Sequence, residues 1–109
     1  MSQLCVLQTT FPIGSQAQSI GKILVERGLA ACAQVAAPIT SVFVWNSQIC
    51  QEAEVVLTLK TLKTHQSALS QALKDLHPYE VPEILTFEVW KASEDYEKWV
   101  NLAVWASLD

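Results

Sequence analysis

The stretch from Leu76 to Ile84 gathers most of the side chains that could bind a ligand or move a proton. It reads LHPYEVPEI, so an imidazole, a phenol and two carboxylates lie beside two prolines. A segment stiffened by proline loses less entropy when its polar groups are held around a ligand. His77 with Glu80 or Glu83 is therefore a candidate metal site. It is also a candidate general base, since an unperturbed imidazole has a pKa of about 6.5.

A structural interpretation of the same stretch is also open. Pro78 predicts the end of a helix, because the residue before a proline avoids helical dihedral angles, and Pro82 keeps the following residues extended. The polar groups would then satisfy backbone groups that lose their partners at the helix end. Because the spacing matches no metal-ligand motif, spacing alone favours this structural interpretation.

Four further side chains have both a functional and a structural interpretation. Lys60 ends an apolar strand and could hold an anion, or it could extend its ammonium group from a sheet edge into water. Trp45 could stack on a ligand, but its place at a hairpin tip favours packing between subunits. Tyr79 could bind a ligand or form a hydrogen bond across an interface. We expect His65 to be a solvated residue on the exposed side of a helix.

No catalytic constellation stands out in the sequence. No serine or cysteine lies at a recognisable spacing from a histidine and a third group, so we expect a protein that is not an enzyme. The three cysteines, Cys5, Cys32 and Cys50, form no CxxC pair. An odd number of unclustered cysteines indicates reduced thiols in a cytoplasmic protein.

The composition indicates a single small domain, residues 1–109, that associates with itself. Half of the residues are hydrophobic, only 17% are charged, and four are tryptophan. So small a domain has little interior for these side chains, and burial between subunits would cover the surplus. The net charge is −4 with no basic cluster, which argues against nucleic acid as a partner. No segment has the length of a membrane span, so no membrane partner is expected.

The pattern of apolar and turn-forming residues predicts seven elements in the order β-α-β-β-α-β-α. Ser15 and Gln18 form a capping-box pair at the start of the first helix, and Ser93 caps the last one. The hairpin arms are about twice the usual ~5–6 residues, so they overhang the domain and need a partner, such as another subunit. The expected elements are a strand from Leu4 to Thr9, a helix from Ser15 to Gly28, a small apolar run from Leu29 to Val35 that Pro38 bends or ends, a hairpin of Ser41–Trp45 and Glu54–Thr61 around Asn46-Ser47-Gln48, a helix from Lys63 to Leu76, a strand from Ile84 to Trp90, and a helix after Ser93.

This order predicts an α+β fold. Its first six elements spell the ferredoxin-like βαββαβ sandwich, in which two helices cover one face of an antiparallel sheet. The last helix is an addition, and its tryptophans suggest that it docks on the sheet or on a neighbouring subunit.

The sequence resembles the CutA family of divalent-cation tolerance proteins. The resemblance extends over nearly the whole chain and is most specific in the proline-rich octet. Cys32, Pro78 and Pro82 belong to the matching motifs as structural hallmarks. The matching stretches are His77–Ile84, Leu24–Cys32, Thr40-Ser41 with Trp45, Glu54–Thr61, and Tyr96 with Trp99.

The resemblance implies a homotrimer similar in build to the PII signalling proteins, with long hairpins that join the subunits. It also implies a role in tolerance of copper and other divalent cations, and ligand clefts between subunits. In some members, copper binding is attributed to a cysteine at the end of the first strand and two adjacent histidines. Only His77 is present here, because Thr9 and Leu76 occupy the other two positions, and neither can replace a thiolate or an imidazole.

We therefore expect a cytoplasmic, non-catalytic homotrimer that binds copper, another divalent cation or a small ligand between subunits. A metal site would have to be rebuilt around His77 and Glu83, with Glu80 or a neighbouring subunit's donor. The expected cleft residues are Lys60, Tyr79, Trp45 and Glu80. Two alternatives stay open: a PII-like module that senses a metabolite without a specific metal site, and an enzyme that uses His77 as a base.

Overall fold

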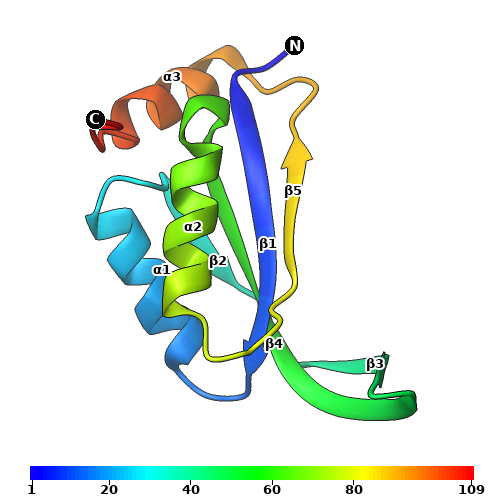
Figure 1. Cartoon of the computed structure of the whole chain (residues 1–109). Helices are drawn as coiled ribbons and strands as arrows, with labels where there is room; N and C mark the ends of the chain where they lie inside the picture. Colours follow the sequence, from blue (N-terminus) through cyan, green and yellow to red (C-terminus); the bar gives the residue numbers. More distant parts are fainter.

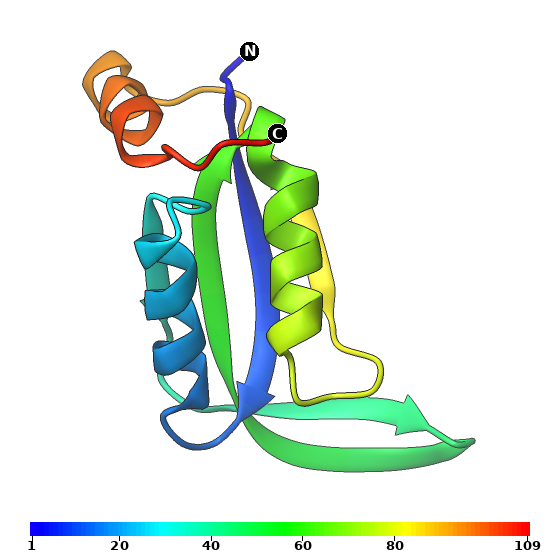
Figure 2. The ribbon, with the colours of Figure 1, turned by 60° about the vertical axis from the view of Figure 1, so that its left-hand side comes forward.

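An antiparallel sheet with two helices on one face forms the body of the protein (Figures 1 and 2). The computed structural model describes all 109 residues. The strand order β2-β4-β1-β5 is the ferredoxin-like order, so the predicted α+β class and the extra C-terminal helix are confirmed. The elements are β1 (Leu4–Pro12), α1 (Gln16–Glu26), β2 (Cys32–Val35), β3 (Ile39–Trp45), β4 (Gln48–Leu62), a 3₁₀ turn (Lys63–His65), α2 (Gln66–Leu76), β5 (Ile84–Glu88) and α3 (Glu94–Ala103).

The core lies between the sheet and the helices α1 and α2. Alternate residues of β1 and β4 point to this side, as the two-residue repeat of a strand requires. Leu7 pairs with Leu59, and Phe11 pairs with Val55. The helical residues that meet them recur at spacings of three and four, as the period of a helix requires. The largest buried side chains of this cluster are Leu7, Phe11, Leu24, Leu57, Leu59, Leu69 and Leu73.

The second strand of the ferredoxin-like pattern is broken in two at Pro38. Val35, at the end of β2, pairs with Leu57, whereas Ile39, at the start of β3, pairs with Glu54. The three residues between Val35 and Ile39 therefore lie opposite the two residues between Glu54 and Leu57, which is a bulge. Proline also removes one backbone donor from the ladder. At this point the hairpin turns away from the body of the protein (Figure 2).

The hairpin of β3 and β4 ends in a tight turn at Asn46 and Ser47. Both residues have positive φ, 50° and 63°, as a two-residue turn of type I′ requires. β1 ends opposite Glu54, so beyond this residue the two arms pair only with each other. The predicted overhang is thus confirmed, although Gln48, expected in the turn, already pairs with Trp45.

The C-terminal helix α3 covers one end of the sheet face that α1 and α2 leave open. Val100 and Val104 pack against Leu4 and Leu62 in a second small core. The predicted cap is confirmed, because the Ser93 hydroxyl accepts a hydrogen bond from the Tyr96 amide at 3.4 Å.

Three further sequence predictions were wrong in detail. His65 is buried, not solvated, because it lies in the 3₁₀ turn before α2; its ring lies 2.9 Å from the Ala106 carbonyl of the C-terminal tail. Ser15 precedes α1 but its side chain forms no capping bond. The last strand ends at Glu88, two residues before Trp90.

Substitution of Gly28 by alanine tests how the C-terminal tail is held. Gly28 has φ of +72°, and an added Cβ would lie 2.5 Å from the Trp105 ring. We expect a loss of about 2–4 kcal/mol in the free energy of unfolding, from backbone strain plus overpacking. Urea unfolding measures it. Gly14→Ala is the control, since Gly14 also has positive φ but has no atom within 4 Å of the added Cβ. A loss in Gly28→Ala no larger than the roughly 1–2 kcal/mol of left-handed backbone strain would exclude a contribution from Trp105.

Candidate functional site

A groove of about 730 Å³ lies between the hairpin and the loop that follows α2. The alternation of β3 and β4 points Trp45, Phe43, Glu52 and Glu54 to the same side. The loop, which Pro78 and Pro82 stiffen, supplies the opposite wall. The lining therefore combines four carboxylates with three aromatic rings and contains no lysine or arginine: Glu52, Glu54, Glu80, Glu83, Trp45, Phe43 and Tyr79.

A short hydrogen bond joins the two walls of the groove. The Tyr79 hydroxyl donates to Glu54 Oε2 at 2.6 Å. Burial raises the pKa of Tyr79, and the bond to Glu54 and the negative charges of Glu54 and Glu52 raise it further. The phenol therefore stays protonated and acts as a donor. Glu54 is only 8% exposed, and no other group donates to its carboxylate.

His77 lies behind this bond, and both nitrogens of its ring have partners. Nε2 donates to the Thr10 carbonyl at 2.9 Å and lies 3.0 Å from Thr9 Oγ1. Nδ1 accepts from the Tyr79 amide at 3.1 Å, and the ring stacks on Phe11 at 4.3 Å. This pattern requires the neutral ring with its proton on Nε2.

The environment of His77 favours the neutral ring. Burial lowers its pKa, and this effect outweighs the Thr10 carbonyl and the Glu54 charge, which both act in the opposite direction. Neither nitrogen has a lone pair free for a metal ion. The ring instead fixes the loop to the end of β1, in line with the structural interpretation of this stretch.

The donors in one protomer do not fit the copper site that the family resemblance implies. No three His, Cys, Asp or Glu side chains come together around a common point. The Thr9 hydroxyl is buried against His77, and Leu76 packs against the core. Cys5, Cys32 and Cys50 are free thiols, and burial raises the pKa of Cys5. Cys32 is half-buried on the open sheet face, in the register position of Lys60.

The structure brings together most of the expected cleft residues but leaves Lys60 apart. Trp45, Tyr79, Glu80 and Glu83 all line the groove. Lys60 instead lies on the open face of the sheet with its ammonium 5.9 Å from the centre of the Tyr96 ring. It is six residues from Glu54 along β4, about 20 Å in an extended strand. Only a neighbouring subunit could bring a Lys60 side chain to this groove.

Sequence reasoning missed the two glutamates of β4 as groove residues. Glu52 and Glu54 stand two residues apart, so both point to one face of the strand. This spacing is visible in the sequence. Their meeting with Tyr79 is not, because it depends on where the hairpin leaves the sheet.

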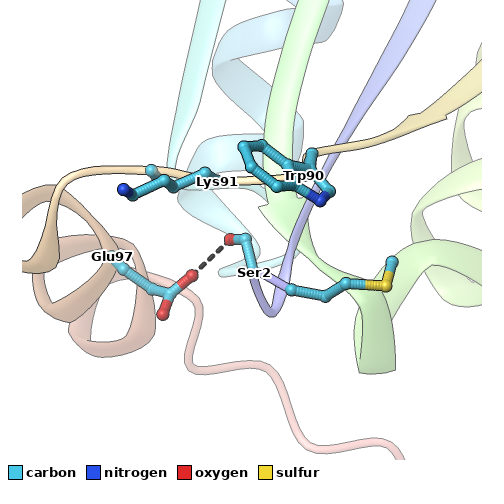
Figure 3. A pocket seen from close by; sticks show the side chains of 6 residues that line it. Ser2, Trp90, Lys91 and Glu97 are labelled. Atoms are coloured by element: carbon cyan, nitrogen blue, oxygen red, sulfur yellow. Dashed lines mark hydrogen bonds between the residues drawn. The ribbon is translucent and has the colours of Figure 1, made fainter.

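A second, smaller pocket of about 370 Å³ lies at the other end of the protein, near the N-terminus (Figure 3). Its one carboxylate, Glu97, accepts hydrogen bonds from the Ser2 hydroxyl and from the Gln3 amide. These two bonds lower the pKa of Glu97. The carboxylate thus attaches α3 to the first strand, which gives this pocket a structural role.

Comparisons with known proteins point to one family. The family model described as "CutA1 divalent ion tolerance protein" matches residues 5–103. A divalent-cation tolerance protein CutA of Escherichia coli O139:H28 is 40% identical over 100 residues, which are 91% of this chain and 88% of that protein. A protein CutA homolog of Xenopus laevis is 37% identical over 98 residues, 90% of this chain, and the match spans 65% of that longer protein.

A solved structure agrees with these relatives over the whole fold. The chain resembles the structure described as the periplasmic divalent cation tolerance protein CutA of Archaeoglobus fulgidus, with a TM-score of 0.88 and 27% identity. The match covers 93% of this chain and 98% of that one.

The buried His77 predicts a loss of stability in mild acid. Because its pKa is lowered in the folded protein, the unfolded chain takes up the proton first as the pH falls. The neutral His77 ring therefore stabilises the folded protein fully above about pH 6.5. This stabilisation is lost as the pH falls from there toward the pKa of His77 in the folded state. Urea unfolding at pH 7.5 and pH 5.5 should show this decrease. His77→Gln should be less stable at pH 7.5 but should lose less between the two values. The same decrease in both proteins would contradict the assignment.

Proposed function

The chain belongs to the CutA1 divalent ion tolerance family, and on this basis we propose that it is a non-catalytic homotrimer that binds cations at clefts between subunits. The groove between the hairpin and the Tyr79 loop forms one wall of each cleft. A neighbouring subunit supplies the other wall. The observation that carries the proposal is a groove with four carboxylates and no lysine or arginine.

The charge of the groove favours a cation over an anionic metabolite. Carboxylates that face one another repel an anion and attract a cation. The PII-like alternative needs a positive group in the cleft, and the expected one, Lys60, is placed outside the groove of its own chain. A metabolite sensor would therefore depend on the Lys60 of a neighbouring subunit.

Among metal ions, the exposed groove residues suit those that accept oxygen donors. Glu80 and Glu83 are exposed carboxylates in the groove, and hard divalent cations prefer such ligands. Copper or zinc binding needs at least one further donor from a neighbouring subunit. His77 contributes by holding the loop in place, since its ring nitrogens already have partners.

Two exposed apolar surfaces support self-association. The hairpin presents unpaired strand edges with Val42 64% exposed and Ile49 75% exposed. The open sheet face presents Leu85 and Phe87, which are nearly half exposed. Unpaired strand edges and contiguous apolar surface are both features that soluble proteins normally cover. A trimer in which each hairpin packs on the next subunit would cover both.

The compartment is proposed from the cysteines. All three thiols are free, and free thiols persist in the reducing cytoplasm. No helix is both long enough and apolar enough to cross a membrane. The Archaeoglobus fulgidus relative is described as periplasmic, so cell fractionation is needed to assign this chain.

Light scattering on the purified protein tests the trimer. We expect three copies per particle at micromolar concentration. Val42→Lys with Ile49→Lys places charges on the exposed hairpin face and should yield monomers, because unpaired charges are costly to bury. Gln18→Lys, on the exposed side of α1, should leave the trimer intact. A folded monomer of the unmodified protein would refute the assembly.

Calorimetric titration of the reduced protein with copper and zinc tests the cation site. We expect Glu80→Gln with Glu83→Gln to weaken binding by about tenfold or more, since each loss removes a charged ligand. Glu26→Gln with Asp75→Asn removes the same net charge from exposed positions outside the groove and should have little effect. Equal metal affinity of the two double variants would show that the groove carboxylates do not bind the metal.

A further inference from the structure

The carboxylates of the groove are spread along it and do not surround a single point. No three acidic or histidine side chains converge on one ion in this chain. Glu52 and Glu54 are on one face of β4, about 7 Å apart along the strand. Glu80 and Glu83 belong to the opposite wall, and the groove of about 730 Å³ is far larger than a bare ion. Such a distribution suits a ligand with several separated positive charges.

Glu54 is a buried carboxylate without a cationic partner. It is 8% exposed, and only its Oε2 accepts a hydrogen bond, from the Tyr79 hydroxyl. The one ion pair of the chain lies elsewhere, between Lys98 and Glu94 on α3. Because no buried side-chain oxygen of the chain lacks a hydrogen-bond partner, the other Glu54 oxygen, Oε1, is open to solvent at the groove. A bound cation could therefore pair with it directly.

Aromatic and apolar side chains lie between the charges. Phe43 and Trp45 alternate along β3 on the same face as Glu52 and Glu54. Trp45 lines the groove and is 45% exposed in one protomer. An ammonium group gains further attraction over an aromatic face, and methylene groups gain contact with the apolar wall. A hydrated metal ion uses neither feature.

We infer that the groove binds a linear aliphatic polyamine, with one ammonium group on Glu54, another at the opposite wall that carries Glu80 and Glu83, and the methylene chain along Phe43 and Trp45. This inference rests on the cleft proposed above and names the class of its ligand. Polyamines are fully charged at neutral pH, so they compete with divalent metal ions for the same carboxylates.

The test is calorimetric titration of the full-length protein, in its native assembly, with spermidine at low ionic strength. We expect one molecule per groove. Glu54→Gln, and separately Glu80→Gln with Glu83→Gln, should weaken binding by about tenfold or more. Trp45→Leu should weaken it by about threefold.

Glu26→Gln with Asp75→Asn is the matched control for net charge. If this control weakens spermidine binding as much as the groove variants do, the binding is only general attraction of a cation by an acidic protein, and the inference is overturned. The absence of binding in the unmodified protein would also overturn it. Because Glu80 and Glu83 are exposed, their variants keep the test informative if Glu54→Gln does not fold.

A parallel titration with zinc separates this inference from the proposed function. Zinc binding that depends on the groove residues, without spermidine binding, would refute the inference of a polyamine ligand and would support the proposed metal site. Groove-dependent spermidine binding without zinc binding would support the inference and would refute direct metal binding at the cleft.

Discussion

The hydrogen bond between Tyr79 and Glu54 joins two parts of the chain that would otherwise be independent. On one side is a loop that leaves α2, and on the other is a hairpin that has just left the sheet. The His77 ring supports this bond from behind, because it fixes the Tyr79 amide to the end of β1. The groove exists because these contacts hold its two walls at a fixed separation.

The same arrangement explains why the family's proline-rich motif can persist here without the copper donors of some members. The prolines and His77 hold the loop in place whether or not a metal ion is bound. Thr9, at the end of the first strand, has its hydroxyl within hydrogen-bond distance of the His77 ring. The motif is thus explained by the shape of the groove, and in the proposed function the carboxylates around it bind the cation.

Much of the fold could be predicted from the sequence because its signals are local. The spacing of Leu69 and Leu73, the cap at Ser93 and the turn at Asn46 are all set by near neighbours in the chain. Pro38 indicated a break, but the shift in register is a property of two strands together. Local patterns alone therefore could not give the direction of the hairpin.

The site was only partly predictable for the same reason. The loop residues Tyr79, Glu80 and Glu83 were identified because they lie on a stretch that prolines stiffen and that resembles the family motif. Glu54 lies 25 residues from Tyr79, and their contact depends on the bend of the hairpin. His65 was misassigned because its partner is the tail at Ala106, 41 residues away. Contacts between distant segments decided which polar groups are buried.

A crystal structure of the native assembly grown with spermidine and zinc would show whether the groove at Glu54 is a cation site. We expect a positively charged ligand within hydrogen-bond distance of the free Glu54 oxygen, with the Tyr79 bond intact. A groove filled by a lysine or arginine of the neighbouring subunit, with the added cations bound elsewhere, would contradict this expectation.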